Sequence, residues 1–279
     1  MKVILLGTAA GGGCPQWNCA CPLCTAGLEP RTQDCVAVSA DGAGWYLLNC
    51  SPDIRSQLLG TPALRPGPGP REIPLRGVLL TDAELDHALG LVLLREAGGL
   101  PVRAPEAVSR ALLPVREIID GYGGWDWLPV SDLPGLRVTC LPVSDKRPKY
   151  ARASDQGGPW VVAYRIEDVS TGGVLVYAPC LKSWPAGFDS FVEGADVVLL
   201  DGTFYAPDEM AGVGGPDQLA MGHLPITASL ARIAERPGPR WAFTHLNNTN
   251  PVLDPASAEH AAVLAAGALL PPDGTEFSL

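Results

Sequence analysis

A chain of 279 residues with 47% hydrophobic side chains can bury a large core, and no shift in composition marks a linker, so we expect one domain over residues 1–279. The formal charge of −10 disfavours contact with a phosphate backbone, and nucleic acid is not an expected partner. The first apolar run is too short for a secretory leader or a membrane span, which predicts a cytoplasmic protein with no membrane partner.

Short runs rich in Val, Leu and Ile alternate with turn signals and predict β-strands along the chain. In chain order, the predicted strands span residues 3–6, 45–48, 78–80, 136–141, 160–166, 174–177, 197–200 and 241–244. Helical patterns lie between them at residues 86–94, 107–113, 225–234 and 256–266. Because several strands follow one another without a helix, the pattern favours a layered α/β fold, with two sheets covered by helices, over a regular βαβ barrel.

A cysteine-rich segment follows the first predicted strand and places three thiols within six residues, at Cys19, Cys21 and Cys24. This spacing lets a tight loop surround one tetrahedral ion, and zinc prefers such soft ligands in structural sites. Thiols without a metal and a redox-active site are the alternatives. No further cysteine has a spacing that suits a fourth ligand. The cysteines at positions 50, 140 and 180 lie in or beside predicted strands and are predicted to be core thiols.

Acidic and imidazole side chains come directly after three of the predicted strands. Each such segment alone has an ordinary explanation: an acidic helix N-terminus, a turn at a strand end, or a half-buried histidine. Loops beyond several strands meet at one edge of a sheet, however, so the three segments together predict a single metal site. Its predicted ligands are Asp82, Asp86, His87, Asp201 and His245.

Other polar residues are weaker candidates for the same site. His223 begins a predicted helix and is either a proton donor, a group that orients a ligand, or a helix cap. The predicted contacts to a substrate carboxylate are Arg55, Arg95, Lys146 and Tyr150. A guanidinium can pair with a carboxylate through two hydrogen bonds, although salt bridges within the fold explain these residues equally well.

The order and spacing of these motifs resemble the metallo-β-lactamase superfamily, whose second motif reads His-x-His-x-Asp-His after a strand. The corresponding segment here is Asp82-x-Glu84-x-Asp86-His87, with carboxylates in place of both leading histidines. A closer resemblance, over nearly the whole chain, is to the family of pyrroloquinoline quinone biosynthesis protein B. The segments that carry it are residues 7–13, 15–19, 51–55, 81–87, 93–96, 201–204, 221–225 and 245–251. This resemblance implies the metallo-β-lactamase fold, an αββα sandwich with its site at an edge of the sheets.

The resemblance also bears on the metal. Hydrolytic members of the superfamily usually hold two zinc ions, but no histidine lies between His87 and His223, so this sequence supports one ion. Two imidazoles with one or two carboxylates are the ligands expected for non-haem iron(II), although zinc binds such a set as well. In a related phosphodiesterase branch, a residue three after the last motif histidine completes the cysteine zinc site. That residue is Asn248 here, a poor zinc ligand, and the fourth position stays open.

The family resemblance implies an iron-dependent, O₂-using hydroxylase of a tyrosine ring derived from a Glu-Tyr unit, on the route to pyrroloquinoline quinone. Asp86, His87 and His223 would be catalytic, with Asp82 or Glu84 as a further ligand or base. The segment 145–158 is expected to line the pocket for a small-molecule or modified-peptide substrate. A zinc hydrolase with metal-bound water as its nucleophile, and a carrier of the quinone, are the alternatives. The oligomeric state is open, with a homodimer among the options.

Overall fold

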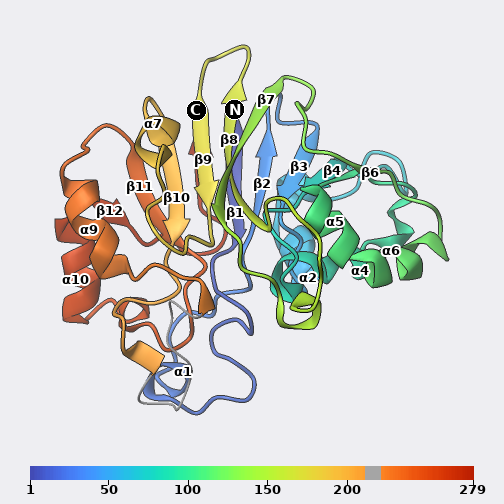
Figure 1. Cartoon of the computed structure of the whole chain (residues 1–279). Helices are drawn as coiled ribbons and strands as arrows, with labels where there is room; N and C mark the ends of the chain where they lie inside the picture. Colours follow the sequence, from blue (N-terminus) through green and yellow to red (C-terminus); the bar gives the residue numbers. More distant parts are fainter. Residues whose placement is uncertain (211–220) are drawn as a thin grey trace.

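The computed structural model describes residues 1–210 and 221–279 and contains two β-sheets packed face to face (Figure 1). The first sheet has the strand order β13-β1-β2-β3-β4-β5-β6. Its strands are β1 (Lys2–Gly7), β2 (Cys35–Ser39), β3 (Trp45–Leu48), β4 (Leu75–Leu79), β5 (Val102–Arg103), β6 (Trp127–Leu128) and β13 (Glu276–Ser278). The second sheet has the order β12-β11-β10-β9-β8-β7. Its strands are β7 (Leu136–Ser144), β8 (Val161–Asp168), β9 (Val174–Ala178), β10 (Val197–Asp201), β11 (Arg240–Thr244) and β12 (Ala268–Leu269).

Helices flank the two sheets on opposite sides of the molecule (Figure 1). Those beside the first sheet are α2 (Ile54–Gly60), α4 (Gly90–Leu93), α5 (Glu106–Ala111) and α6 (Leu113–Asp120). Those beside the second sheet are α7 (Phe188–Val192), α9 (Ile226–Ala234) and α10 (Ala258–Ala265). Shorter elements are α1 (Pro22–Thr25), α3 (Leu85–Ala88), η1 (Pro62–Leu64), η2 (Arg95–Ala97), η3 (Lys149–Ala151) and η5 (Pro251–Leu253). A helix with the length and apolar character needed to cross a bilayer does not occur in the described ranges.

Alternate residues of the strands contribute to different cores. In β1, Val3 and Leu5 belong to the core between the sheets, whereas Ile4 and Leu6 pack with the helices that cover the first sheet. Strands that are buried on both faces read as nearly continuous hydrophobic runs, and for this reason the sequence pattern identifies them. The predicted αββα sandwich is therefore confirmed.

The structure adds elements that the sequence pattern does not predict. The additional strands are β2, β5, β6, β12 and β13, and three of them are only two residues long. Such short strands are defined by their pairing partners, because they are too short to show a period of their own. The predicted helix 86–94 is divided into α3 and α4 around Leu89, and α6 was not predicted.

The strand directions explain where the site forms. Strands β9, β10 and β11 are parallel to one another, and β4 is parallel to β3. Their carboxyl ends lie at the lower edge of the molecule in Figure 1, the edge at which α1 also lies. The loops that follow these strands therefore meet in one place, and they carry the predicted acidic and imidazole side chains.

Candidate metal centre

His87 lies on α3, fully buried, and a carboxylate fixes the orientation of its ring. The two carboxylate oxygens of Asp82 are 2.9 and 2.8 Å from Nδ1 of His87. Asp82 also accepts hydrogen bonds from the Thr81 hydroxyl (2.7 Å) and the Glu84 backbone N–H (2.9 Å). With Nδ1 donating to a carboxylate, the lone pair of the imidazole is on Nε2.

The Nε2 atom of His87 is the clearest sign that the site suits a metal ion. It is buried and has no hydrogen-bond partner within the described residues, whereas buried polar atoms are normally paired. Burial disfavours a charged imidazole, yet the carboxylates of Asp82 and Asp86 outweigh burial and raise the pKa of His87 to about 10. A divalent cation would satisfy both the unpaired nitrogen and the negative field around it.

His245 follows β11 and approaches His87 from the second sheet. Its ring centroid is 5.0 Å from that of His87, and its Nε2 is 3.3 Å from Oδ2 of Asp86. Its Nδ1 is 2.7 Å from the Thr203 hydroxyl, which in turn donates to Asp201 at 2.7 Å. Nδ1 of His245 is thus held by a hydrogen bond, and Nε2, which lies against Asp86, is the nitrogen that an ion could bind in place of that contact. His245 thus lies between the ring of His87 and the carboxylate of Asp86 in the wall of one site.

Asp201 and His223 form a second buried pair beside the first. Asp201 accepts hydrogen bonds from the backbone N–H groups of Leu181 (2.7 Å) and Thr203 (3.0 Å), and its Oδ2 is 2.8 Å from Nδ1 of His223. Burial alone would raise the pKa of Asp201, but the imidazoles of His223 and His245 outweigh burial and lower it. The ring of His223 stacks on His245 at 5.4 Å between centroids. Asp201 therefore orients His223.

Asp34 is a buried carboxylate behind His245 that the sequence analysis missed. It accepts hydrogen bonds from the hydroxyls of Tyr177 and Thr244, the residue next to His245. Burial raises the pKa of Asp34, although His245 and His87 act in the opposite direction. Asp34 directly precedes β2, and because that strand was not predicted, no signal marked its position at a strand end.

A cavity of about 660 Å³ opens over these groups. Asp86, His87, His223 and His245 line it, and so do Lys146 and Tyr150, as predicted for the segment 145–158. Lys146 pairs with Glu84 at 3.0 Å, and the Tyr150 hydroxyl donates to the backbone oxygen of Ala83 at 2.5 Å. The segment is therefore attached to the residues that precede α3.

Two predicted substrate contacts do not reach this cavity. Arg55 is exposed on α2, a helix that turns Ile54 and Gln57 inward instead. Arg95 lies in η2, donates to the backbone oxygen of Val92 and stacks over a tyrosine ring. Neither lines the cavity, so the prediction is wrong for both: both lie on elements away from the opening.

Among the predicted core thiols, Cys140 is exposed on β7, so the prediction is wrong for this residue. Cys180 is buried in the core, as predicted, and it also lines the cavity. It follows the end of β9, and its sulfur lies within 4.8 Å of ligand atoms of His87 and His245. Burial, followed by the carboxylates of Asp82 and Asp201, raises the pKa of Cys180 well above its usual value. The signal was available: Cys180 ends a strand beside β10, at the same edge as Asp201.

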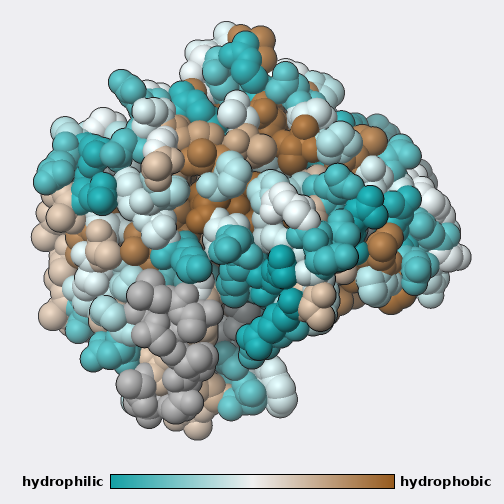
Figure 2. All heavy atoms as spheres, in the orientation of Figure 1, coloured by the Kyte–Doolittle hydropathy of each residue, from teal (hydrophilic) through white to brown (hydrophobic). Residues whose placement is uncertain are grey.

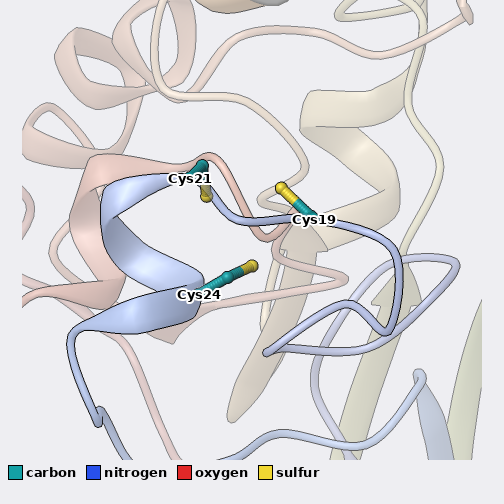
Figure 3. Close-up of side chains that lie close together, drawn as sticks. All are labelled: Cys19, Cys21 and Cys24. Atoms are coloured by element: carbon teal, nitrogen blue, oxygen red, sulfur yellow. The ribbon is translucent and has the colours of Figure 1, made fainter.

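The three clustered cysteines lie around α1, with their sulfur atoms directed toward a common space (Figure 3). The sulfur atoms of Cys19, Cys21 and Cys24 all lie within 4.8 Å of one another. Asn248, from the loop after β11, places its side-chain amide nitrogen 3.3 Å from the sulfur of Cys24 and 3.8 Å from that of Cys21. The predicted cluster therefore forms, with Asn248 beside it.

Comparison with known proteins identifies the relatives of this chain. The profile of the β-lactamase superfamily domain matches residues 44–246. Coenzyme PQQ synthesis protein B of Methylobacterium sp. (strain 4-46) is 39% identical, and that of Azotobacter vinelandii is 37% identical, each over 100% of both chains. The crystal structure of Zn²⁺-bound PqqB from Methylobacterium extorquens superposes with a TM-score of 0.92 at 36% identity, again over 100% of both chains. By fold and by full-length similarity, this chain belongs to the PqqB family of the metallo-β-lactamase superfamily.

Proposed function

We propose that this chain is an iron-dependent hydroxylase that uses O₂ on a tyrosine-derived, Glu-Tyr type intermediate of pyrroloquinoline quinone biosynthesis. One observation carries the proposal: the unpartnered Nε2 of buried His87 lies in the cavity wall beside His245, whose own Nε2 is 3.3 Å from the Asp86 carboxylate. Two imidazoles and one carboxylate, with room for further ligands, are typical of non-haem iron(II) sites that use oxygen.

The remaining predicted ligands have other roles in this proposal. Asp82 holds Nδ1 of His87 and Asp201 holds Nδ1 of His223, and both carboxylates already accept several hydrogen bonds. Partners of this kind fix the orientation of a ligand and increase its basicity. We therefore assign Asp82 and Asp201 to orientation and Asp86 to direct binding.

Iron(II), when bound, supplies the one-electron chemistry that dioxygen requires. The overall reaction inserts one oxygen atom into the ring, and the other leaves as water with two protons and two electrons from an external reductant such as ascorbate. His223 faces the cavity, and its Nδ1 donates a hydrogen bond to Asp201. His223 is thus placed to hold or deliver a proton at its Nε2, the role of a general acid or base.

The basic side chains that line the cavity fit a substrate that carries carboxylates. Arg147, Lys149 and Arg152 line the cavity together with Lys146, and within the described residues only Lys146 pairs with an acidic side chain. Figure 2 shows hydrophilic side chains over the lower middle of this face, where Figure 1 draws the segment between β7 and β8. Three cations without acidic partners among residues 1–210 and 221–279, in a chain with a net charge of −10, favour an anionic ligand.

The cysteine cluster is a separate structural site in this proposal. Three converging sulfur atoms suit a zinc ion, and such an ion would join α1 to the loop of Asn248. Because His245 belongs to the same loop as Asn248, this zinc would also hold the metal-site edge in place. The bound Zn²⁺ of the Methylobacterium extorquens relative is compatible with this assignment.

The decisive experiment is a turnover assay with isotopically labelled dioxygen. Protein reconstituted anaerobically with iron(II) would receive ascorbate, a Glu-Tyr peptide and labelled O₂, and mass spectrometry would follow the label. We expect the wild-type protein to form product that carries the label. The His245→Ala variant should form no labelled product, and neither should the zinc-loaded wild type.

In Arg152→Ala the KM should rise about 10- to 100-fold, since a charge-assisted hydrogen bond contributes about 1.5–3 kcal/mol. Arg116→Ala, at a partly exposed arginine of α6 that does not line the cavity, is the matched control.

Two outcomes would reject the hydroxylase. Incorporation of oxygen from water by zinc-loaded protein would support the alternative hydrolase, for which the Asp201–His223 pair offers a leaving-group acid. Stoichiometric binding of substrate or quinone without conversion, under any metal, would support a carrier.

A further inference from the structure

Cys180 lies at the border between the core of the second sheet and the cavity, and it belongs to both. The residue is 8% exposed, and within the described residues its sulfur makes no hydrogen bond. Its sulfur and the ring nitrogens of His87 and His245 lie within 4.8 Å of one another. This spacing is short enough for one ion to contact all three groups, because metal–nitrogen and metal–sulfur bonds are about 2.0–2.3 Å long.

A second, independent observation points to a ligand at the same place. His87 has a fully buried side chain whose Nε2 has no partner in the described part of the chain, and Asp82 occupies its other nitrogen. His245 is oriented in the same way, since Thr203 occupies its Nδ1. In both imidazoles Nε2 is therefore the nitrogen available to an ion beside Cys180; it has no partner in His87 and lies against Asp86 in His245.

The competing candidate for a further protein ligand is Asp201, and its hydrogen bonds argue against it. Its four acceptor positions meet four donors: two from Thr203, one from the Leu181 N–H and one from His223. Metal binding by Asp201 would break at least one of these bonds and release His223. The thiol of Cys180 has no such bond to lose.

We propose that Cys180 binds the active-site ion through its sulfur, completing a ligand set with His87, His245 and Asp86. The proposal rests on the metal site assigned above. Binding replaces the S–H bond with a metal–sulfur bond and releases the proton to solvent. A thiolate is softer than water or a carboxylate. The ligand set that includes Cys180 therefore binds zinc and cobalt more strongly than two imidazoles and a carboxylate alone. The thiolate also lowers the reduction potential of bound iron.

Cobalt(II) substitution of the full chain tests this proposal. We expect wild-type protein to show thiolate-to-cobalt charge-transfer absorption that exceeds the contribution of the Cys19, Cys21 and Cys24 cluster. In Cys180→Ser the excess absorption should disappear. Cobalt affinity at the His87 site should also fall by about 10- to 100-fold, because loss of a ligand should cost at least as much affinity as loss of a group that orients one. Cys140→Ser, at an exposed cysteine of β7, should retain both properties.

A second variant and a second measurement keep the test decisive if Cys180→Ser folds poorly. Cys180→Asp should restore cobalt affinity without the charge-transfer band. Cobalt-edge X-ray absorption of the wild type should contain one sulfur neighbour at about 2.3 Å more than the Cys180 variants do.

Identical cobalt spectra and equal sulfur counts in wild type and Cys180→Ser would overturn the proposal. That result would leave the hydroxylase intact, provided that iron binding still depends on His245. Conversely, a sulfur ligand found in a protein without hydroxylase activity would support the Cys180 ligand while rejecting the function proposed above.

Discussion

At the residue scale, a hydrogen bond to Nδ1 fixes the ring of His87 and the ring of His245 and leaves Nε2 as the nitrogen that can bind an ion. Asp82 occupies Nδ1 of His87, and Thr203 occupies Nδ1 of His245. His245 has a φ of 57°, a left-handed conformation that is strained for a residue with a side chain. The backbone N–H groups of the next two residues donate to Thr8 and Thr203, which hold the chain in this conformation. Strain that the surroundings impose in this way is typical of functional sites.

The orienting role of Asp82 leads to a prediction for Asp82→Asn. The substitution keeps the shape of the side chain but removes the charge that holds the Nδ1 proton of His87. We expect iron(II) and zinc affinity to fall about 10- to 100-fold without loss of the fold. Competition with a chelating dye measures this, and Asp126→Asn, at an exposed aspartate, is the control. Unchanged affinity would contradict the assignment.

At the scale of elements, α3 and α4 are fixed by their contact with the end of β3. The Cys50 N–H donates to the backbone oxygen of His87 at 2.6 Å, and the Gly90 N–H donates to the oxygen of Cys50 at 3.0 Å. The two backbones approach so closely that a Cβ atom on Gly90 would lie 2.1 Å from the oxygen of Ser51. The position of His87 therefore depends on a glycine three residues later.

Gly90→Ala should lower both stability and metal affinity. The atoms that a methyl group would meet are backbone atoms, which cannot rotate away, so we expect a loss of about 1–3 kcal/mol in the free energy of unfolding. Gly60→Ala is the control, because a Cβ atom at the end of α2 meets nothing within 4 Å. Urea denaturation of the two variants measures the difference. Equal free energies of unfolding in the two variants would contradict this prediction, because α3 and α4 could then shift without loss of stability.

At the scale of the whole molecule, the sandwich gathers carboxylates and imidazoles from both sheets into one buried edge. Asp86 and His87 come from the segment after β4, and Asp201 and His245 come from the ends of β10 and β11. Burial opposes the charge of Asp86, but His87 and His245 outweigh burial and hold its pKa well below its usual value. Stability should therefore depend on pH and on the metal together.

Metal-free protein should lose stability as the pH rises through the range in which His87 titrates. The pKa of His87 is raised from 6.5 to about 10, so its contribution is complete below pH 6.5 and is lost as the pH rises toward 10. Thermal unfolding of chelator-treated protein across this pH range measures the loss of stability. In His87→Gln the stability should depend less on pH. In metal-loaded protein the stability should instead rise with pH, because the ion and the proton compete for the same nitrogen of His87. A parallel decline in wild type and His87→Gln would contradict this account.

Much of the fold and part of the site follow from the sequence. Strands buried on both faces are nearly continuous hydrophobic runs, and this pattern predicts all of the longer strands except β2. Asp86, His87 and His245 stand at strand ends, and parallel strands bring their ends together. The spacing of Cys19, Cys21 and Cys24 within six residues confines the three thiols to a small volume, and the structure places them there.

Only the tertiary structure distinguishes the roles of chemically similar residues. Asp82 and Asp201 carry the same carboxylate as Asp86, but their hydrogen bonds direct them toward imidazoles. Arg55 and Lys146 are both cationic, and only Lys146 faces the cavity. The sequence determines which groups are present and which strand each one ends, because hydrophobic periodicity is local. The direction in which each group points depends on contacts between residues far apart in the chain, and those contacts exist only once the two sheets have packed.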